Sequence, residues 1–479
     1  MLFVFAAPIF FVAHYKRQAV QALVVAFGVA LHQQVPAATD LVDLRPTTQV
    51  GSYRQTKVVV DVEGKLKLNA DGKEVQHLPL KVHAELQYAE RVLAQSKQWS
   101  DVRLARSYET AQATIRLRES ELKNQLRAER KLIVVESTMA QPSAVFSPLG
   151  PLTREELELV ETTASGLALE ALLPPRALKI GGQWPLADGA VARLLGLEAV
   201  SQHDVACTLD SVKDNLAIVS LAGKVAGAVG GVSSDIELKG KLNFDLKQRA
   251  VTWLTVACKE NRAVGHAQPG FEVVTTLRLV SAPVKAVAEL SDKALANLPL
   301  KASQPQLLID LASEAGGFQL THDRRWSVLF ERGDATVLRL VDRGDLIAQC
   351  NISPVAPLGS GEQLTLEGFQ ADVKRVLGKN FEQIAEASEE ASDAQIRILR
   401  VVVAGKADDL AIQWTYYHLS DDHGRRASLV FTIESSLLER FAAIDRELID
   451  GFRFTAENQP SPAAPKSAVN SGDDGPLLR

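Results

Sequence analysis

The chain has 479 residues, of which 46% are hydrophobic and 23% are charged, the balance of an ordinary globular protein with two or three domains. Its formal net charge of −5 is small for this length. That charge argues against a nucleic-acid partner, which would need a concentrated basic surface.

Residues 1–38 have the order of a secretory signal peptide. Basic residues 14–17 precede an apolar run at 19–31, and Val35-Pro36-Ala37 supplies the small residues of a cleavage site. The run is shorter than the ~20 residues of a membrane-spanning helix. We therefore expect export to the periplasm or outside a bacterial cell. The alternative is that the apolar run at 2–13 helps an uncleaved segment to tether the protein to a membrane.

Residues 39–282 are predicted to form a β-rich α+β domain. Alternation of apolar and polar residues, which indicates strands with one wet face, starts at 57–68 and continues at 78–88. Asp235–Leu246 alternates best, and the turn residues after it predict a hairpin with a strand at 251–259.

Two helices are expected inside this domain. Ser100 is a good N-cap for the first helix. Its apolar residues recur at helical spacing: Ala105, Tyr108, Ala111 and Ile115. Thr153 and Glu156 have the spacing of a capping box, which predicts the start of the second helix. Capping and the helix dipole also explain the neighbouring carboxylates better than acid–base catalysis does: Glu155, Glu156 and Glu158.

Residues 283–306 are rich in Ala, Lys and Pro and loosely patterned, which indicates a linker. A second domain is expected at 307–455, with several strands, a helix at about 366–377 and a closing helix from Ser435 or Ser436. The apolar stripe of that helix is expected to run as far as Phe452. Residues 456–479 have the composition of a disordered tail.

The second domain resembles the PsbP-like family. The resemblance is carried by Gly317–Leu320, the strand at Trp326, the helix in mid-domain and the closing segment Ile449–Phe454. It implies an α/β/α sandwich that acts as a binding module without shared catalytic residues. The first domain, through residues 147–157 and 260–266, is similar to uncharacterised exported bacterial proteins, which implies no activity. The expected fold class is therefore α+β, with a β-rich antiparallel domain followed by a PsbP-like α/β/α sandwich.

The cysteines are too few and too scattered for a disulfide framework. Buried free thiols are expected at Cys207, Cys258 and Cys350. A bridge between Cys207 and Cys258 is the alternative, if their strands are neighbours.

Glu260, Arg262 and His266 are the candidate residues for binding a ligand or partner. They follow a strand and precede Pro269-Gly270, and loops in such positions often carry function. Strand parity places Glu260 and Arg262 on one face, where they can form an ion pair or a polar pocket. A purely structural turn is the competing interpretation.

A metal site is not expected, although one weak candidate stands out: His418, Asp421, Asp422 and His423. A solvated hairpin loop explains this segment equally well, since it joins two predicted strands and ends at Gly424. No catalytic signature for a hydrolase elbow, a phosphate-binding loop or a dinucleotide fold is present. No cofactor is therefore expected.

These observations favour an exported, non-enzymatic binding protein whose two modules bind a protein or envelope component. One alternative is a carrier of an apolar ligand or lipid, because a curved antiparallel sheet can enclose such a molecule. An extracytoplasmic hydrolase is the second alternative. We expect contact with a membrane only through an uncleaved N-terminal segment.

Overall fold

The structure is a computed structural model that describes residues 41–47, 49–68, 75–96, 102–137, 143–161, 169–332, 335–359, 362–392 and 396–455. The predicted signal peptide at 1–38 and the predicted tail at 456–479 lie outside these ranges. Among the described residues, no helix is long and apolar enough to cross a membrane.

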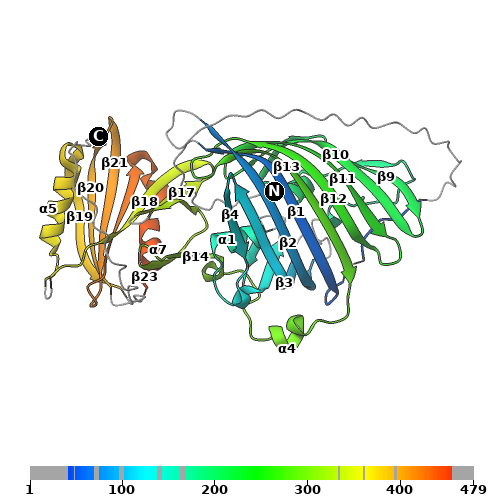
Figure 1. The fold of residues 1–479 in the computed structure, drawn as a ribbon, viewed down its shortest axis with the longest axis horizontal. Helices are drawn as coiled ribbons and strands as arrows, with labels where there is room; N and C mark the ends of the chain where they lie inside the picture. Colours follow the sequence, from blue (N-terminus) through cyan, green and yellow to red (C-terminus); the bar gives the residue numbers. More distant parts are fainter. Residues whose placement is uncertain are drawn as a thin grey trace, which may run out of the picture.

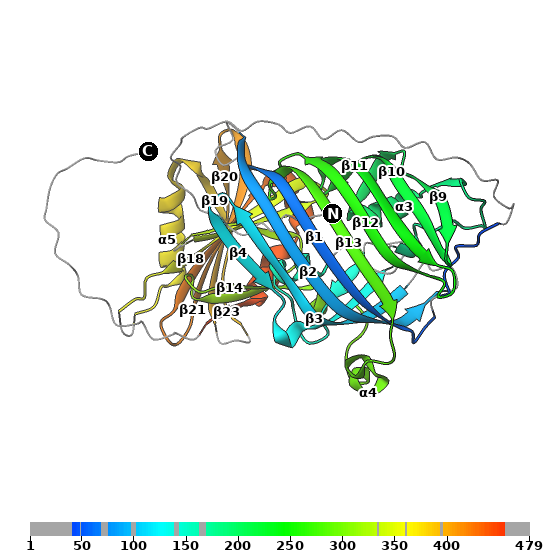
Figure 2. The ribbon, with the colours of Figure 1, turned by 45° about the vertical axis from the view of Figure 1, so that its right-hand side comes forward.

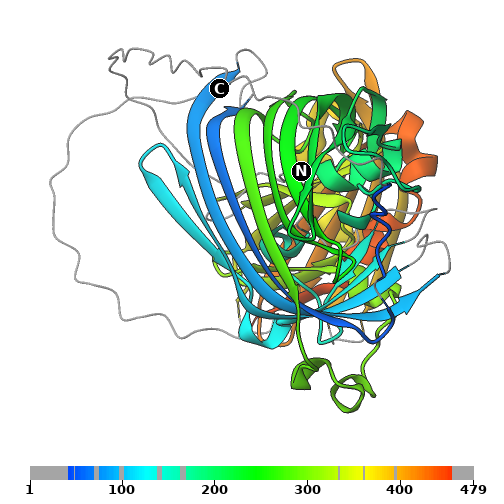
Figure 3. The same cartoon turned by 90° about the vertical axis from the view of Figure 1, so that its right-hand side faces the viewer.

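The first part of the chain forms a strongly curved antiparallel sheet, called the curved sheet below (Figures 1 and 3). Within the described ranges it has thirteen strands. In chain order they are β1 (Tyr53–Leu68), β2 (Gln76–Gln95), β3 (Val102–Leu117), β4 (Ser120–Gln125), β5 (Leu132–Ser137), β6 (Ala144–Phe146), β7 (Gln183–Pro185), β8 (Ala199–His203), β9 (Ala206–Lys213), β10 (Leu216–Val229), β11 (Val232–Asp245), β12 (Ala250–Arg262) and β13 (Gly270–Pro283). The first strand, β1, pairs with the last, β13, so the two ends of this part meet inside the sheet.

One face of the curved sheet carries the core. Val58, Val60 and Val62 of β1 are buried, and the residues between them are more exposed, because successive side chains of a strand point to opposite faces. They share one core with Leu157 of α1 (Arg154–Val160) and Leu195 of α3 (Asp188–Leu195). Full burial of one such side chain contributes about 1.5–3 kcal/mol, and this repeated burial holds α1 and α3 against the sheet.

A connecting segment leads from β13 to the second part and packs back on the curved sheet. It contains η2 (Ala288–Leu290), α4 (Asp292–Leu295) and η3 (Gln304–Leu307), and Figure 2 shows α4 projecting below the strands. Leu290 and Leu295 are buried against Ala89 and Ala105. The Ser291 side chain accepts a hydrogen bond from the Ala294 amide and caps α4.

The second part contains a larger and a smaller antiparallel sheet, called the second sheet and the small sheet. Within the described ranges the second sheet consists of β16 (Trp326–Arg332), β17 (Ala335–Asp342), β18 (Asp345–Val355), β19 (Phe381–Ala391), β20 (Arg397–Ala407), β21 (Leu410–Ser420) and β22 (Arg426–Glu434). The small sheet consists of β14 (Ile309–Ser313), β15 (Phe318–His322) and β23 (Phe452–Phe454). The helical segments are α5 (Leu366–Leu377), η4 (Gly378–Asn380), η5 (Ser435–Leu437), α6 (Leu438–Phe441) and α7 (Ile444–Asp450), while η1 (Ala128–Arg130) belongs to the first part.

The predicted α+β class, with a PsbP-like α/β/α sandwich as the second domain, is wrong. Of the described residues, 58% are in strands and 16% in helices. The helix at 366–377 is present as α5 and covers one face of the second sheet through Phe369 and Val373. The opposite face packs against short helices together with the small sheet, so no second helical layer forms.

The helix predicted after Ser100 is also wrong, because residues 102–117 form β3. This strand pairs with β2 along nearly its whole length, from Val102 to Leu117. The closing helix is broken rather than continuous. Ala442, with φ of 45°, separates α6 from α7, and Phe452 lies in β23 instead of ending a helical stripe.

Candidate functional site

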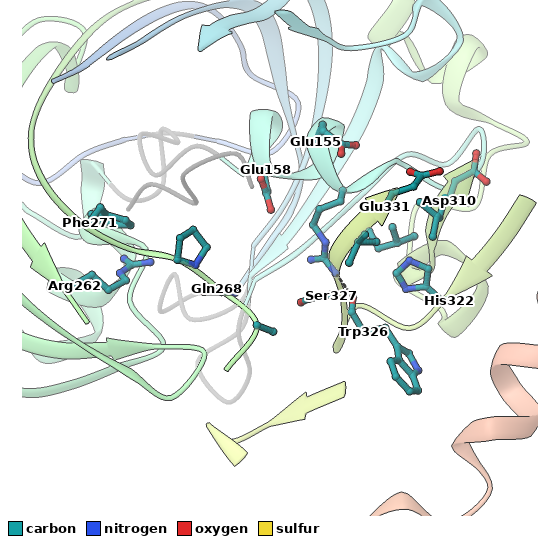
Figure 4. Close-up of a pocket in the computed structure, with 16 residues that line it drawn as sticks. Glu155, Glu158, Arg262, Gln268, Phe271, Asp310, His322, Trp326, Ser327 and Glu331 are labelled. Atoms are coloured by element: carbon teal, nitrogen blue, oxygen red, sulfur yellow. Dashed lines mark hydrogen bonds between the residues drawn. The ribbon is translucent and has the colours of Figure 1, made fainter. Parts of the chain in front are cut away.

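A cavity of about 100 Å³ lies where the curved sheet meets the second part (Figure 4). An engineered protein cavity of ~150 Å³ holds benzene, so this one suits a smaller guest. Both parts of the chain contribute to its wall. The polar and aromatic residues of the wall are Arg154, Glu155, Glu158, Arg262, Gln268, Phe271, Asp310, His322, Trp326, Ser327 and Glu331.

Helix α1 brings two carboxylates to the cavity. The capping box predicted for this helix is confirmed: the Thr153 side chain accepts from the Glu156 amide, and Glu156 accepts from the Thr153 amide. Arg127 also donates to Glu156, at 2.7 Å, so that carboxylate is fully engaged in holding the helix start. Glu155 and Glu158, on the same helix, line the cavity instead.

Glu158 points into the open space between the two parts. In the view of Figure 4, its carboxyl group lies between Phe271 on the left and Ser327 on the right. Among the described residues, no hydrogen bond or ion pair engages this carboxyl group. Burial raises the pKa of Glu158 to about 8, against an opposing effect of the Arg154 charge. The group is therefore mostly protonated at pH 7 and can both donate and accept a hydrogen bond.

His322 lines the cavity from β15. The residue is 3% exposed, and its Nδ1 lies 2.8 Å from the carbonyl oxygen of Asp323. A carbonyl oxygen only accepts, so Nδ1 carries the proton and Nε2 is an acceptor in the neutral ring. Burial lowers the pKa of His322 to about 4, which keeps the ring neutral at physiological pH. In the described part of the chain, Nε2 has no hydrogen-bond partner.

Arg154 ties the first part to the second beside this cavity. Its Nη2 donates to the backbone oxygens of Arg324, at 2.6 Å, and Trp326, at 3.0 Å. A parallel bridge between Leu152 and Ile309 lies next to it, with the Asp310 amide donating to the Leu152 oxygen. These hydrogen bonds position β14 and the start of β16 against α1.

Glu260 lies against Arg262, which lines the opposite wall of the cavity. Nη2 of Arg262 is 2.7 Å from Oε1 of Glu260, and both side chains are buried. Ser234 donates to the same Glu260 oxygen at 2.5 Å, and the Arg262 guanidinium lies 4.6 Å from the centre of the Phe271 ring. Arg262 lines the cavity, but its charge is already paired with Glu260.

His266 does not join this pair. The residue is exposed and outside the cavity wall. Its backbone oxygen accepts from Nη1 of Arg339 in β17, at 2.5 Å, which adds a further hydrogen bond between the two parts. Of the three candidate residues, the structure therefore brings Glu260 and Arg262 together and leaves His266 apart.

The weak metal candidate does not form a site. His418 is buried in β21, and its Nε2 lies 3.2 Å from Nε of Arg426, which occupies the lone pair that a metal would need. Asp421 accepts from the amides of His423 and Arg425 and so closes the turn. Asp422 is exposed. Throughout the described ranges, no group of three or more His, Cys, Asp or Glu side chains is placed to hold a metal ion.

The three cysteines are buried, and none of them forms a disulfide within the described residues. Cys207 lies in β9 and Cys258 in β12, with β10 and β11 between them, so the alternative of a bridge is wrong. Burial raises the pKa of the Cys207 and Cys258 thiols to about 12. Burial also raises the pKa of Cys350. None of these thiols is poised to react as a thiolate.

Sequence reasoning does not identify the cavity wall: it assigns Glu155 and Glu158 to capping, and it does not indicate His322, Asp310 or Glu331. The last three lie beyond the connecting segment and reach the cavity only because β14, β15 and β16 pack beside α1. One signal in the sequence is Glu158, a carboxylate two positions after Glu156 that the capping box does not need.

No family model matches the chain, and no curated protein matches it. Among solved structures, the PsbP of a Synechocystis cyanobacterium is 12% identical over 33% of this chain and 99% of its own, with a TM-score of 0.25. The Ran-binding protein Mog1p of Saccharomyces cerevisiae is 8% identical over 31% of this chain and 95% of its own, with a TM-score of 0.24. A lipovitellin structure is 9% identical over 71% of this chain and 32% of its own, with a TM-score of 0.30. The chain is thus distantly similar to PsbP and Mog1p over about a third of its length, and likenesses this weak carry no functional argument.

Proposed function

We propose that this is an exported binding protein that takes a small polar ligand in the cavity between its two parts. The cavity carries the proposal, because its wall offers polar groups that have no hydrogen-bond partner among the described residues. The buried His322, whose Nε2 is one of these groups, and Glu158 both line it. Buried polar groups normally have partners, and a ligand that supplied such partners would gain hydrogen bonds in this cavity.

The two alternative functions receive less support. The apolar side chains on the inner face of the curved sheet are already buried in one core with α1 and α3. No observation therefore favours the first alternative, a carrier of an apolar ligand. A hydrolase needs a nucleophile paired with a base. In the described ranges, the hydrogen bond of His322 goes to a backbone carbonyl rather than to a hydroxyl or thiol.

A cavity-filling variant tests the proposal. Ser327 of β16 lines the cavity, and Ser327→Phe places a ring in a space of about 100 Å³. We expect small polar compounds to raise the melting temperature of the wild-type protein saturably and to lose this effect in the variant. Ser388→Phe is the matched control, since Ser388 lies in β19, the opposite edge strand of the second sheet. Equal responses in wild type and Ser327→Phe would reject the cavity as the binding site.

Export is tested separately. Residues 14–38 support it through their order of basic, apolar and small residues. Fractionation of cells that express the full chain, followed by N-terminal sequencing, should find the mature protein outside the cytoplasm and starting near residue 38. Protein with an intact N-terminus in the cytoplasmic fraction would overturn the proposal of export, but it would not contradict the proposal of ligand binding.

A further inference from the structure

Arg154 lines the cavity with a positive charge that no carboxylate pairs within the described ranges. Its Nη2 donates to the backbone oxygens of Arg324 and Trp326, and these two bonds hold the guanidinium in place. A guanidinium has five N–H donors, and those on Nε and Nη1 have no partner among the described residues. The other arginine of the wall differs, because Arg262 lies 2.7 Å from Oε1 of Glu260. Arg154 therefore keeps both a charge and N–H donors for a ligand.

Two of the wall's four carboxylates are engaged with groups of the protein. Arg127 lies 3.5 Å from Asp310, and Oε1 of Glu331 accepts a hydrogen bond from a hydroxyl group at 2.5 Å. In the ranges that the structure describes, Glu155 has neither a hydrogen bond nor an ion pair. Glu158 is mostly protonated at pH 7, so it adds little negative charge to the wall.

The charge of Arg154 acts on groups from both parts of the chain, Glu158 in α1 and His322 in β15 (Figure 4). Burial raises the pKa of Glu158, and among the charges that act on this carboxyl group Arg154 has the largest effect. Burial lowers the pKa of His322, and the Arg154 charge again exceeds each of the opposing charges. The smaller, opposing effects come from four carboxylates: Glu155 and Glu161 at Glu158, and Asp310 and Asp323 at His322.

We infer that the cavity binds the anionic group of a small carboxylate ligand, and that the guanidinium of Arg154 donates hydrogen bonds to it. This inference rests on the proposed function and adds the charge and class of the ligand. A hydrogen bond between a guanidinium and a carboxylate is charge-assisted, which makes it about twice as strong as a neutral one. An ammonium would bring a second positive charge to Arg154 and offer no acceptor to its N–H groups.

The balance of charge also favours a carboxylate over a phosphate group. A phosphate monoester carries a charge of about −1.5 to −2 at pH 7. One unpaired guanidinium with Glu155 beside it offsets a single negative charge better than a double one.

Glu158 should make this binding depend on pH. Its pKa is about 8, because the group is buried, so the side chain is mostly neutral at pH 7 and mostly ionised at pH 9. The ionised group repels an anion bound beside Arg154. With binding confined to the protonated form, whose fraction falls from about 0.9 to about 0.1, the affinity drops up to about tenfold between pH 7 and 9. Binding at pH 8 should take up as much as about half a proton from solution.

The test uses the full chain and three probes with equal numbers of non-hydrogen atoms: acetate, acetamide and propylammonium. Ligands of this size bind weakly, so binding is followed by NMR titration at constant ionic strength, in buffers without carboxylate or phosphate. We expect acetate to bind saturably at pH 7, at least about tenfold more tightly than acetamide, and propylammonium not to bind. The affinity for acetate should fall between pH 7 and 9 as given above.

Two variants separate the roles of the side chains. Arg154→Gln removes the charge and should weaken acetate binding at least about tenfold, with a smaller change for acetamide. Urea unfolding checks that this variant is folded, since Arg154 also joins the two parts. Glu158→Gln is neutral at every pH and should bind acetate equally at pH 7 and 9 without proton uptake, and this result decides the inference if Arg154→Gln does not fold. Glu129→Gln, a change at an exposed residue outside the cavity wall, should behave as the wild type does.

The outcomes distinguish this inference from the proposed function. Propylammonium binding in preference to acetate, or acetamide binding as tightly as acetate, would overturn the carboxylate assignment and leave a protein that binds another polar ligand. A loss of acetate affinity between pH 7 and 9 that is as steep in Glu158→Gln as in the wild type would overturn the assignment as well. Failure of all three probes to bind would overturn the inference and the proposed function together.

Discussion

Replacing Glu158 by glutamine should change how the stability of the protein depends on pH. The pKa of this carboxyl group is about 8 in the folded protein, against a normal 4.5. Below 4.5 the group is protonated in both the folded and the unfolded states and contributes nothing. Above 4.5 the unfolded chain loses the proton and the folded protein keeps it, so the free energy of unfolding falls by about 1.36 kcal/mol per pH unit.

At pH 7, 2.5 units above the normal value, this loss reaches about 3 kcal/mol, and it levels off above pH 8. Glu158→Gln lacks the loss and should be more stable at pH 7 by up to that amount, with no difference near pH 4.5. Urea unfolding from pH 4.5 to 9 measures the difference. Parallel stability curves for wild type and variant would refute the reasoning, while Glu129→Gln, an exposed site, should give parallel curves.

Three further predictions concern other parts of the molecule. Arg262→Met leaves Glu260 buried without its partner and should cost about 3–5 kcal/mol in urea unfolding, more than Arg262→Met combined with Glu260→Gln. Gly231→Ala should destabilise the protein by at least about 1 kcal/mol in the same assay, because a Cβ would lie 2.1 Å from Cα of Gly344 and φ is 71°. A thiol reagent at pH 8 should label no cysteine in the native protein and all three after denaturation: Cys207, Cys258 and Cys350. A single fast-reacting thiol in the native protein would contradict their burial.

The sequence predicted the regular strands well and failed where a strand changes phase. Alternation indicated β11 and β12, whose pairing runs from Ser234 opposite Arg262 to Asp245 opposite Ala250. In β3, a bulge at Glu109 shifts the register with β2. Buried positions are mostly even-numbered before the bulge and odd-numbered after it. Tyr108 and Ala111 consequently stand three apart across it, which imitates the spacing of a helix.

The candidate site was predictable only within one strand. Parity along β12 is local information, and it indicated that Glu260 and Arg262 share a face. The cavity depends on long-range packing instead: His322 comes from beyond the connecting segment and meets α1 because Arg154 binds two backbone oxygens there. No spacing in the chain reports such a meeting. The capping box correctly identified Glu156, but it says nothing of Glu158, which faces away from the helix start.

Ile309 limits how this chain can be taken apart. It begins β14 of the small sheet, yet it is 1% exposed and buried in the core of the curved sheet, bridged to Leu152. A chain truncated after residue 306 would lose the Ile309 side chain and leave a cavity in the core of the curved sheet. The loss of a buried isoleucine side chain lowers the free energy of unfolding by about 2–5 kcal/mol. The two halves are therefore not interchangeable building blocks, and a foreign neighbour fused to either one would have to supply an apolar side chain for the same place.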